Sequence, residues 1–264
     1  MDPDAGVDVD ADRVIMAYIR ESRRARDLPR VGPFALLLTE ATRLRFLNYA
    51  IPDDGADPDD SDVAALVAAF RAADRMPRVE FLPSVAPALE SRLTATGWTV
   101  EDRLPLMTCT TRSVRDLPPP DGIVMATPSN DATLLEMARL QHRIFDDPEP
   151  PDERTVTRLR DSLNRGGRAL VSLDPETRQV VAAAQSGPPA SGATEVVGVV
   201  VAPAHRRRGL GAALVSSLAH QGFDAGLSTV FLEAAPRADG AYRNAGFRRT
   251  STSVHISLER DLDA

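Results

Sequence analysis

The stretch Glu195-Val-Val-Gly-Val-Val-Val-Ala-Pro-Ala-His-Arg-Arg-Arg-Gly-Leu-Gly-Ala-Ala-Leu214 decides the fold of the second half of this chain. Its first part is a β-branched run that predicts a buried strand, and the enclosed glycine predicts a close approach of a ligand or another backbone. Three arginines and two glycines then lead into a helix rich in Ala and Leu. Such a loop presents consecutive backbone N–H groups at the positive end of a helix dipole, which predicts an anion site.

Three kinds of phosphate ligand compete for this loop. A Rossmann dinucleotide site would need a third glycine at Leu214, and a P-loop would need a lysine, which the chain lacks. The remaining common ligand is coenzyme A, whose pyrophosphate would lie against Gly209 and Gly211 and whose third phosphate would meet the arginines. The alternative is that Arg206, Arg207 and Arg208 form only a solvated turn before a helix.

The spacing of this segment resembles a known family, the GCN5-related N-acetyltransferases (GNAT). The resemblance rests on Val201-x-Pro203-x-x-Arg206-x-x-Gly209-x-Gly211-Ala212, on Glu195 six residues before the valine, and on Tyr242-x-x-x-Gly246-Phe247. The chain departs from the family at Ala235, where many members carry an asparagine that contacts the cofactor arm.

The resemblance implies transfer of an acetyl group from acetyl-CoA directly to a primary amine, without a metal. It implies that Glu195 is the base and Tyr242 the acid, although Glu195 could also be an ordinary strand-end glutamate and Tyr242 a core aromatic. Phe247 is expected in the core. The family's cofactor-binding segment corresponds to Val199, Val200, Val201, Arg206, Arg207, Arg208, Gly209, Leu210, Gly211 and Ala212.

The two halves of the chain repeat one order of elements, each ending in a helix, a glycine, an aromatic residue and a strand. We therefore expect a mixed α/β fold with two GNAT-like domains in tandem, although two α/β domains can share such an order by chance. The proline-rich segment 113–121 is the predicted linker between residues 1–112 and the catalytic domain 122–264. The first domain is expected to be degenerate, with a structural or substrate-shaping role, because Asp53–Asp62 holds six aspartates and Leu93 replaces the tyrosine.

Hydrophobic periodicity predicts the individual elements. Helices are expected over 11–26, 63–73, 86–96, 131–145, 154–164, 209–222 and 238–244, with Ser61 or Asp62 as the N-cap of the second. Strands are expected over 34–39, 45–51, 78–82, 98–110, near 123, and over 168–173, 179–185, 194–201, 229–234 and 248–258.

Composition excludes several classes of protein. A formal net charge of −7 argues against nucleic-acid binding, and the lone Cys109 can form neither an internal disulfide nor a zinc site. No apolar run is long enough to span a membrane and the N-terminus is acidic, so we expect a cytoplasmic protein. The sequence leaves its oligomeric state open between a monomer and a homodimer. The acidic segment 145–153 could attract a cationic amine or simply be solvated. A rival hypothesis is a non-catalytic acyl-CoA-binding sensor or interaction module.

Overall fold

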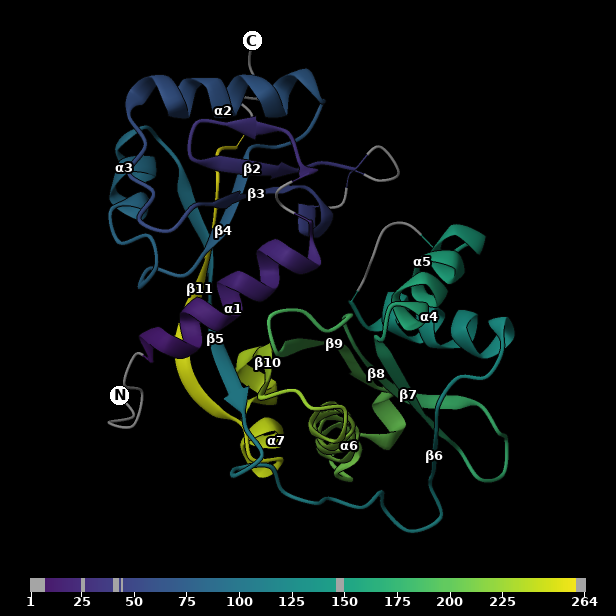
Figure 1. The fold of residues 1–264 in the computed structure, drawn as a ribbon. Coiled ribbons are helices and arrows are strands. Elements are labelled where there is room, and N and C mark those ends of the chain that lie inside the picture. The colour runs from purple at the N-terminus through teal and green to yellow at the C-terminus, as the bar shows by residue number, and fades with distance from the viewer. Residues whose placement is uncertain (1–7, 25–26, 40–42, 44, 146–149, 260–264) are drawn as a thin grey trace. The chain divides into compact units, whose positions relative to one another are not determined.

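A computed structural model describes residues 8–24, 27–39, 43, 45–145 and 150–259 (Figure 1). The chain divides into two compact units. The first contains the described residues up to Leu106 together with those from Arg249 onward, and the second runs from Met107 to Arg248. Among the described residues, none of the helices has the length and apolar character needed to cross a membrane.

The first unit is built around one sheet that includes the C-terminal strand of the chain. Its strands follow the order β1-β2-β3-β4-β11-β5, so β11 lies between β4 and β5, and it pairs antiparallel with β4. The predicted boundaries had placed this last strand in the second domain. The elements are α1 (Val9–Ser22), β1 (Arg30–Val31), β2 (Phe34–Leu37), β3 (Tyr49–Pro52), α2 (Asp60–Ala72), β4 (Arg78–Phe81), α3 (Leu89–Ala95), β5 (Thr99–Cys109) and β11 (Arg248–Ser257).

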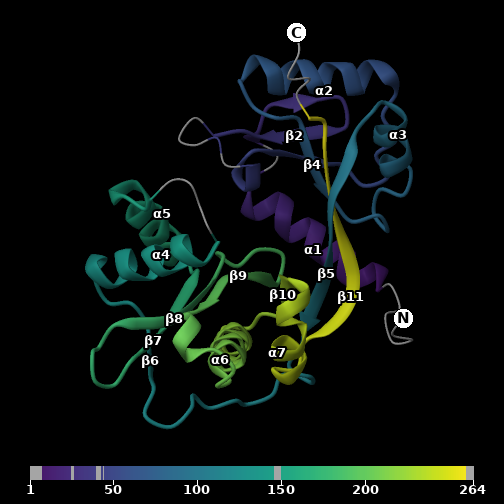
Figure 2. The same ribbon diagram turned by 180° about the vertical axis from the view of Figure 1, so that it is seen from behind.

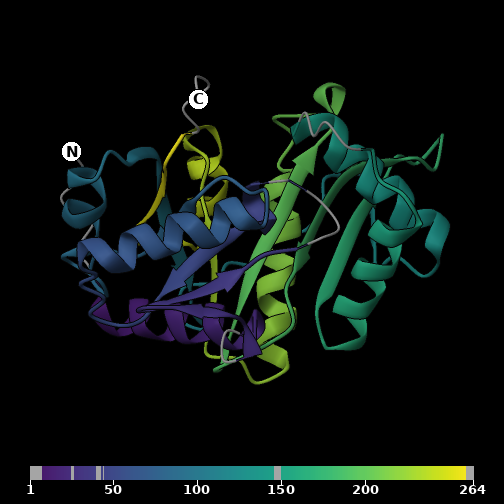
Figure 3. The same ribbon diagram turned by 90° about the horizontal axis from the view of Figure 1, so that it is seen from above.

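Helices cover both faces of this sheet. Residues of α2 and α3 pack with alternate strand residues such as Leu36 and Ala50 in one buried cluster. Helix α1 lies on the opposite face of β2 and β3 from α2 (Figure 3). The carboxylate of Asp12, a fully buried residue of α1, accepts hydrogen bonds from the hydroxyls of Ser84 and Ser251. A buried carboxylate therefore ties α1 to this unit.

The N-terminus of α2 differs from the prediction. Asp59 is the N-cap, and its side chain accepts a hydrogen bond from the backbone N–H of Asp62. The backbone N–H of Asp59 in turn donates to the Asp62 carboxylate, which completes a capping box. Ser61 and Asp62 therefore lie inside the helix. Any aspartate in this run can cap, and the reciprocal pair of bonds favours Asp59 because it satisfies two backbone donors at once.

The second unit has a sheet in the order β10-β9-β8-β7-β6, with parallel pairing between β10 and β9 and antiparallel pairing elsewhere. Helix α6 packs on one face of this sheet, and α4 and α5 pack together on the other face (Figure 2). Strand β8 is therefore apolar along most of its length, as expected for a strand covered on both faces. The elements are β6 (Val124–Ala126), α4 (Asp131–Phe145), α5 (Glu153–Asn164), β7 (Arg168–Leu173), β8 (Val180–Ser186), β9 (Ala193–Val201), α6 (Leu210–Asp224), β10 (Thr229–Glu233) and α7 (Asp239–Asn244).

The proline-rich segment is anchored to the second unit. The Arg115 N–H donates to the carbonyl of Ala245, and the Ser216 hydroxyl donates to the carbonyl of Arg115. At Gly246, where φ is +97°, an added Cβ would lie 1.9 Å from the carbonyl oxygen of Ser113. The glycine of the Tyr-x-x-x-Gly-Phe motif thus has a structural reason, namely the close passage of this segment. Phe247 is 1% exposed, which confirms its place in the core.

The predicted strand 45–51 is a strand only in its second half. Residues Arg45–Leu47 form a 3₁₀ turn, and β3 begins only at Tyr49. The guanidinium of the buried Arg78 lies 5.9 Å from the centre of the Phe46 ring, and it donates a hydrogen bond to the carbonyl of Arg45. Long-range contacts of this kind outweigh the local strand propensity of the apolar run.

Candidate active site

A cavity of about 350 Å³ lies in the second unit, where β9 separates from β10. The described pairing of these strands runs from Ala193 to Glu195, and the cavity is lined farther along β9 by Val199–Val201. Between these points β9 bulges, because Ala183 pairs with Val200 while Gln185 pairs with Val197. Gly198 accommodates the bulge with φ of +65°, and its carbonyl accepts a hydrogen bond from the Gln141 amide at 2.9 Å. The strand edge toward the cavity therefore retains backbone groups that β10 does not pair.

The loop before α6 forms the second wall of this cavity. Gly209 is the N-cap of α6, with φ of +86° and no side-chain capping bond, so the helix begins at Leu210. Arg207 also takes a left-handed conformation, with φ of +61°. Consecutive backbone N–H groups at a helix start are unsatisfied within the helix, and here they lie beside a cavity. An ideal Cβ on Gly211 would lie 3.7 Å from Val201, so a larger side chain there would enter the space between loop and strand.

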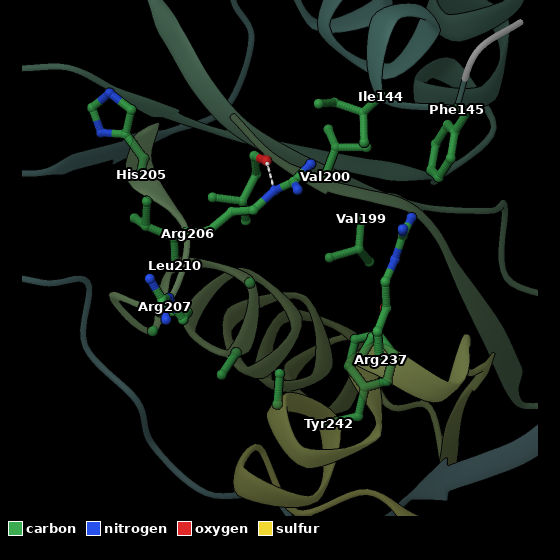
Figure 4. Close-up of a pocket in the computed structure, with 16 residues that line it drawn as sticks. Ile144, Phe145, Val199, Val200, His205, Arg206, Arg207, Leu210, Arg237 and Tyr242 are labelled. Carbon is green, nitrogen blue, oxygen red and sulfur yellow. Dashed lines mark hydrogen bonds between the residues drawn. The ribbon is translucent and has the colours of Figure 1, made fainter. Parts of the chain in front are cut away.

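Three arginines give the polar lining of the cavity a positive charge. They are Arg206, Arg207 and Arg237, and the described lining residues include no acidic side chain. His205 is a further polar residue of the lining. The Arg206 Nε donates to the carbonyl of Val201 at 3.1 Å, which holds this side chain along the strand (Figure 4). This arrangement suits an anionic ligand.

Arg208 does not line the cavity, although the sequence predicts it among the cofactor-binding residues. Its guanidinium lies 3.4 Å from Nδ1 of His205, and Nε2 of His205 lies 4.0 Å from the Asp174 carboxylate. The pKa of Asp174 is held below its usual value, first by the hydrogen bond from the Thr177 backbone. Arg208 thus belongs to a small polar cluster behind the loop.

Tyr242 comes from α7 and is 7% exposed. Its ring centre lies 6.5 Å from that of Phe247, and it lines the cavity at the end near Val199 (Figure 4). Burial raises the pKa of its phenol to about 12, because the charged form would lose hydration. The hydroxyl is consequently protonated, and able to donate, throughout the ordinary pH range.

Glu195 lies apart from the residues that line this cavity. It is half-buried, pairs in register with Phe231 of β10, and stands at the last paired position before the two strands separate. A direct contact between its carboxylate and a group at Val199 would have to span four strand residues. Any proton transfer between them would therefore need a bridging water.

The sequence misses several lining residues. Ile144, Phe145, Arg237, Ala238 and Ala241 complete the wall of the cavity. Ile144 and Phe145 end α4, while the other three precede or begin α7, so only tertiary structure brings them beside β9. Arg237 and the two alanines could have been suspected because they are close to Tyr242 in the sequence. No sequence signal points to Ile144 or Phe145.

A comparison with known protein families matches most of the second unit to one family. Residues 134–247 match the family model described as "Acetyltransferase (GNAT) family". These residues form a GNAT-family domain. The match contains the whole of β9, the arginine loop, α6 and Tyr242, and therefore all the predicted site residues of the GNAT domain.

Solved structures show the same tandem fold. A GCN5-related N-acetyltransferase from Kribbella flavida is 24% identical with a TM-score of 0.75, covering 97% of this chain and 96% of that one. A GCN5-related N-acetyltransferase from Sphaerobacter thermophilus is 14% identical with a TM-score of 0.63, covering 96% and 93%. A tandem GNAT protein from the clavulanic acid biosynthesis pathway is 14% identical with a TM-score of 0.59, covering 95% of each chain. No curated protein sequence matches the chain.

Two further predicted features concern charge and metals. The acidic segment predicted near the acceptor lies partly outside the described residues, because 146–149 are not among them. The described residues contain no group of three or more His, Cys, Asp or Glu side chains arranged to hold a metal ion. Cys109 is fully buried, and burial raises the pKa of its thiol.

Proposed function

We propose that the GNAT domain of this chain transfers an acetyl group from acetyl-CoA to a primary amine. One observation carries the proposal. The open start of α6 and the unpaired edge of β9 face each other across one cavity that ends at a protonated, buried tyrosine. These are the features that a diphosphate, an amide-containing arm and a thioester would need, in that order.

The backbone N–H groups from Arg207 to Ala212 would bind the pyrophosphate of coenzyme A. Gly209 and Gly211 leave their approach clear, and Arg206 and Arg207 add charge-assisted hydrogen bonds. Val199, Val200 and Val201 would pair through their backbone with the pantetheine amides and the acetyl carbonyl. Leu210 lines the same cavity and is 1% exposed. Arg208 would act on the loop through His205 instead of on the phosphates.

Proton transfer would involve Tyr242, which lines the cavity, and Glu195, which does not. As the amine attacks the thioester carbon, the carbon–sulfur bond breaks and negative charge develops on sulfur, where the Tyr242 hydroxyl would donate a hydrogen bond. A phenol with a pKa near 12 is a weaker acid than a thiol, whose pKa is about 8.5, so this donor stabilises the thiolate more than it protonates it. Glu195 would accept the proton of the ammonium through water.

The first unit would not bind coenzyme A. The loop that corresponds to the arginine loop is closed by its own ion pairs, with Asp53 2.5 Å from Arg30, Asp54 2.6 Å from Arg20 and Asp57 2.7 Å from Arg92. Leu93, in the place of the tyrosine, is fully buried. We propose that this unit is a degenerate GNAT-like domain and that each chain holds one coenzyme site.

Thiol release from acetyl-CoA tests the proposal. The full-length protein should release free thiol only when an amine acceptor is added, with one acetylated amine formed per thiol. Tight binding of coenzyme A with no thiol release above the uncatalysed background, whichever amine is added, would instead support the non-catalytic sensor. Failure to bind coenzyme A would reject both.

A further inference from the structure

Arg237 places a third guanidinium group in the cavity, away from Arg206 and Arg207 of the arginine loop. Its side chain rises from the turn Pro236–Ala238 past the Tyr242 ring, and its guanidinium ends between Val199 and Phe145, whereas His205 and Arg207 stand at the other end (Figure 4). Among the described residues, none forms a hydrogen bond or an ion pair with the Arg237 guanidinium. Within the described part of the chain, this permanently charged group lines the cavity without a partner.

The expected position of acetyl-CoA does not account for the charge of Arg237. If its phosphates lie at the start of α6, then the neutral pantetheine arm and the neutral acetyl group occupy the end near Val199 and Tyr242. An arginine at that end therefore has no anionic group of the coenzyme to bind. An anion that binds Arg237 would therefore belong to the acceptor or to a different acyl group.

The position of Arg237 favours the acceptor as the source of that anion. Arg237 is exposed, and the neighbouring Phe145 is 55% exposed, so this end of the cavity is open to a second substrate. Tyr242, in contrast, is buried beside the predicted thioester. An amine that enters here would meet a fork of donors suited to a carboxylate and an aromatic face for its apolar part.

We propose, building on the acetyltransferase function above, that Arg237 binds a carboxylate of the acceptor, so that the acceptor is a carboxylate-bearing amine such as an amino acid or a short peptide. The inference narrows the expected primary amine to one that also carries a carboxylate. It also assigns a substrate-binding role to a residue outside the coenzyme motif.

Matched acceptors test this assignment. Free amino acids and dipeptides, their C-terminal amides and the polyamine spermidine would be compared with acetyl-CoA as donor, in wild-type protein and in Arg237→Gln. We expect carboxylate-bearing amines to be the best acceptors. Arg237→Gln should lower their kcat/KM by about 10- to 100-fold, the contribution of a lost charge-assisted hydrogen bond, while changing the kcat/KM of the matched amides less than threefold.

Three controls keep the outcomes distinct. Arg139→Gln removes another exposed arginine of the same unit that does not line the cavity, and it should leave every acceptor unchanged. Binding of coenzyme A, measured first in each variant, should be unaffected by Arg237→Gln, and loss of binding would assign Arg237 to the coenzyme. If the wild-type protein fails to bind coenzyme A, the proposed function itself fails.

Other results would overturn the inference. An equal loss of rate for acids and amides would mean that Arg237 stabilises the reacting carbonyl oxygen. A preference for spermidine, or no acetylation of any amine in the panel by a protein that binds coenzyme A, would reject a carboxylate-bearing acceptor. Faster turnover of succinyl-CoA than acetyl-CoA that depends on Arg237 would place the carboxylate on the acyl group.

Discussion

Replacing Tyr242 by phenylalanine removes only the hydroxyl that lines the cavity. The ring and its contact with Phe247 are retained, so the free energy of unfolding should change little. A hydrogen bond to a charged group contributes about 1.5–3 kcal/mol, and full general-acid catalysis about 10²–10⁴-fold. Since burial raises the pKa of Tyr242 to about 12, hydrogen bonding to the thiolate should dominate. We expect kcat to fall by about 100-fold, where the two ranges overlap, with little change in KM for acetyl-CoA.

The pH profile provides a second, independent readout of Tyr242. A phenol with a pKa of about 12 stays protonated up to that pH, so its ionisation should not lower kcat between pH 7 and 10. An unperturbed tyrosine would lose half of its protonated form at about pH 10. Steady-state thiol release across this range, in wild-type protein and in Tyr242→Phe, measures both effects. An unchanged kcat in the variant, or a falling limb centred at or below pH 10 that the variant abolishes, would refute the reasoning.

Three further predictions follow from particular residues. Gly246→Ala should lower the free energy of unfolding in urea by about 2–4 kcal/mol because its Cβ would collide with the Ser113 carbonyl, whereas Gly226→Ala, with φ of +86° and nothing within 4 Å, should cost about 1 kcal/mol; equal losses would contradict this. Burial raises the pKa of Asp12, so the unfolded chain loses this proton first and the free energy of unfolding should fall as pH rises from 4 to 7; Asp12→Asn should remove that part of the fall, and parallel curves would count against it. Glu195→Gln should lower kcat most at low pH, where the amine is protonated, with partial recovery at higher pH; a constant ratio across pH would exclude Glu195 as the base.

Local signals in the sequence were sufficient for the coenzyme loop. Strand, loop and helix follow one another between Ala193 and Asp224, and the two glycines sit where the helix must start. The predicted residues from Val199 to Ala212 therefore meet at one cavity, except Arg208. Arg208 differs because the left-handed Arg207 next to it changes the direction of the chain, which no composition pattern reveals.

Contacts between distant segments set the limits of the sequence analysis. Phe145 and Arg237 are far apart in the chain, and only the packing of α4 and α7 around β9 brings them to one cavity. The place of β11 between β4 and β5 likewise depends on pairing across most of the chain, which local periodicity cannot predict. The alternation of apolar residues was enough to identify β11 as a strand but not its neighbours.

Calorimetric titration of acetyl-CoA into the full-length protein, with Gly211→Ala and Gly211→Asp beside it, tests the central claim most directly. An alanine Cβ at this position makes only ordinary contacts, 3.7 Å from Val201 and 3.9 Å from Val199, whereas an aspartate would add bulk and negative charge beside the start of α6. We predict one site per chain in the wild-type protein, retained binding in Gly211→Ala and no detectable binding in a folded Gly211→Asp. Two equivalent sites per chain, or wild-type affinity in the aspartate variant, would contradict the account.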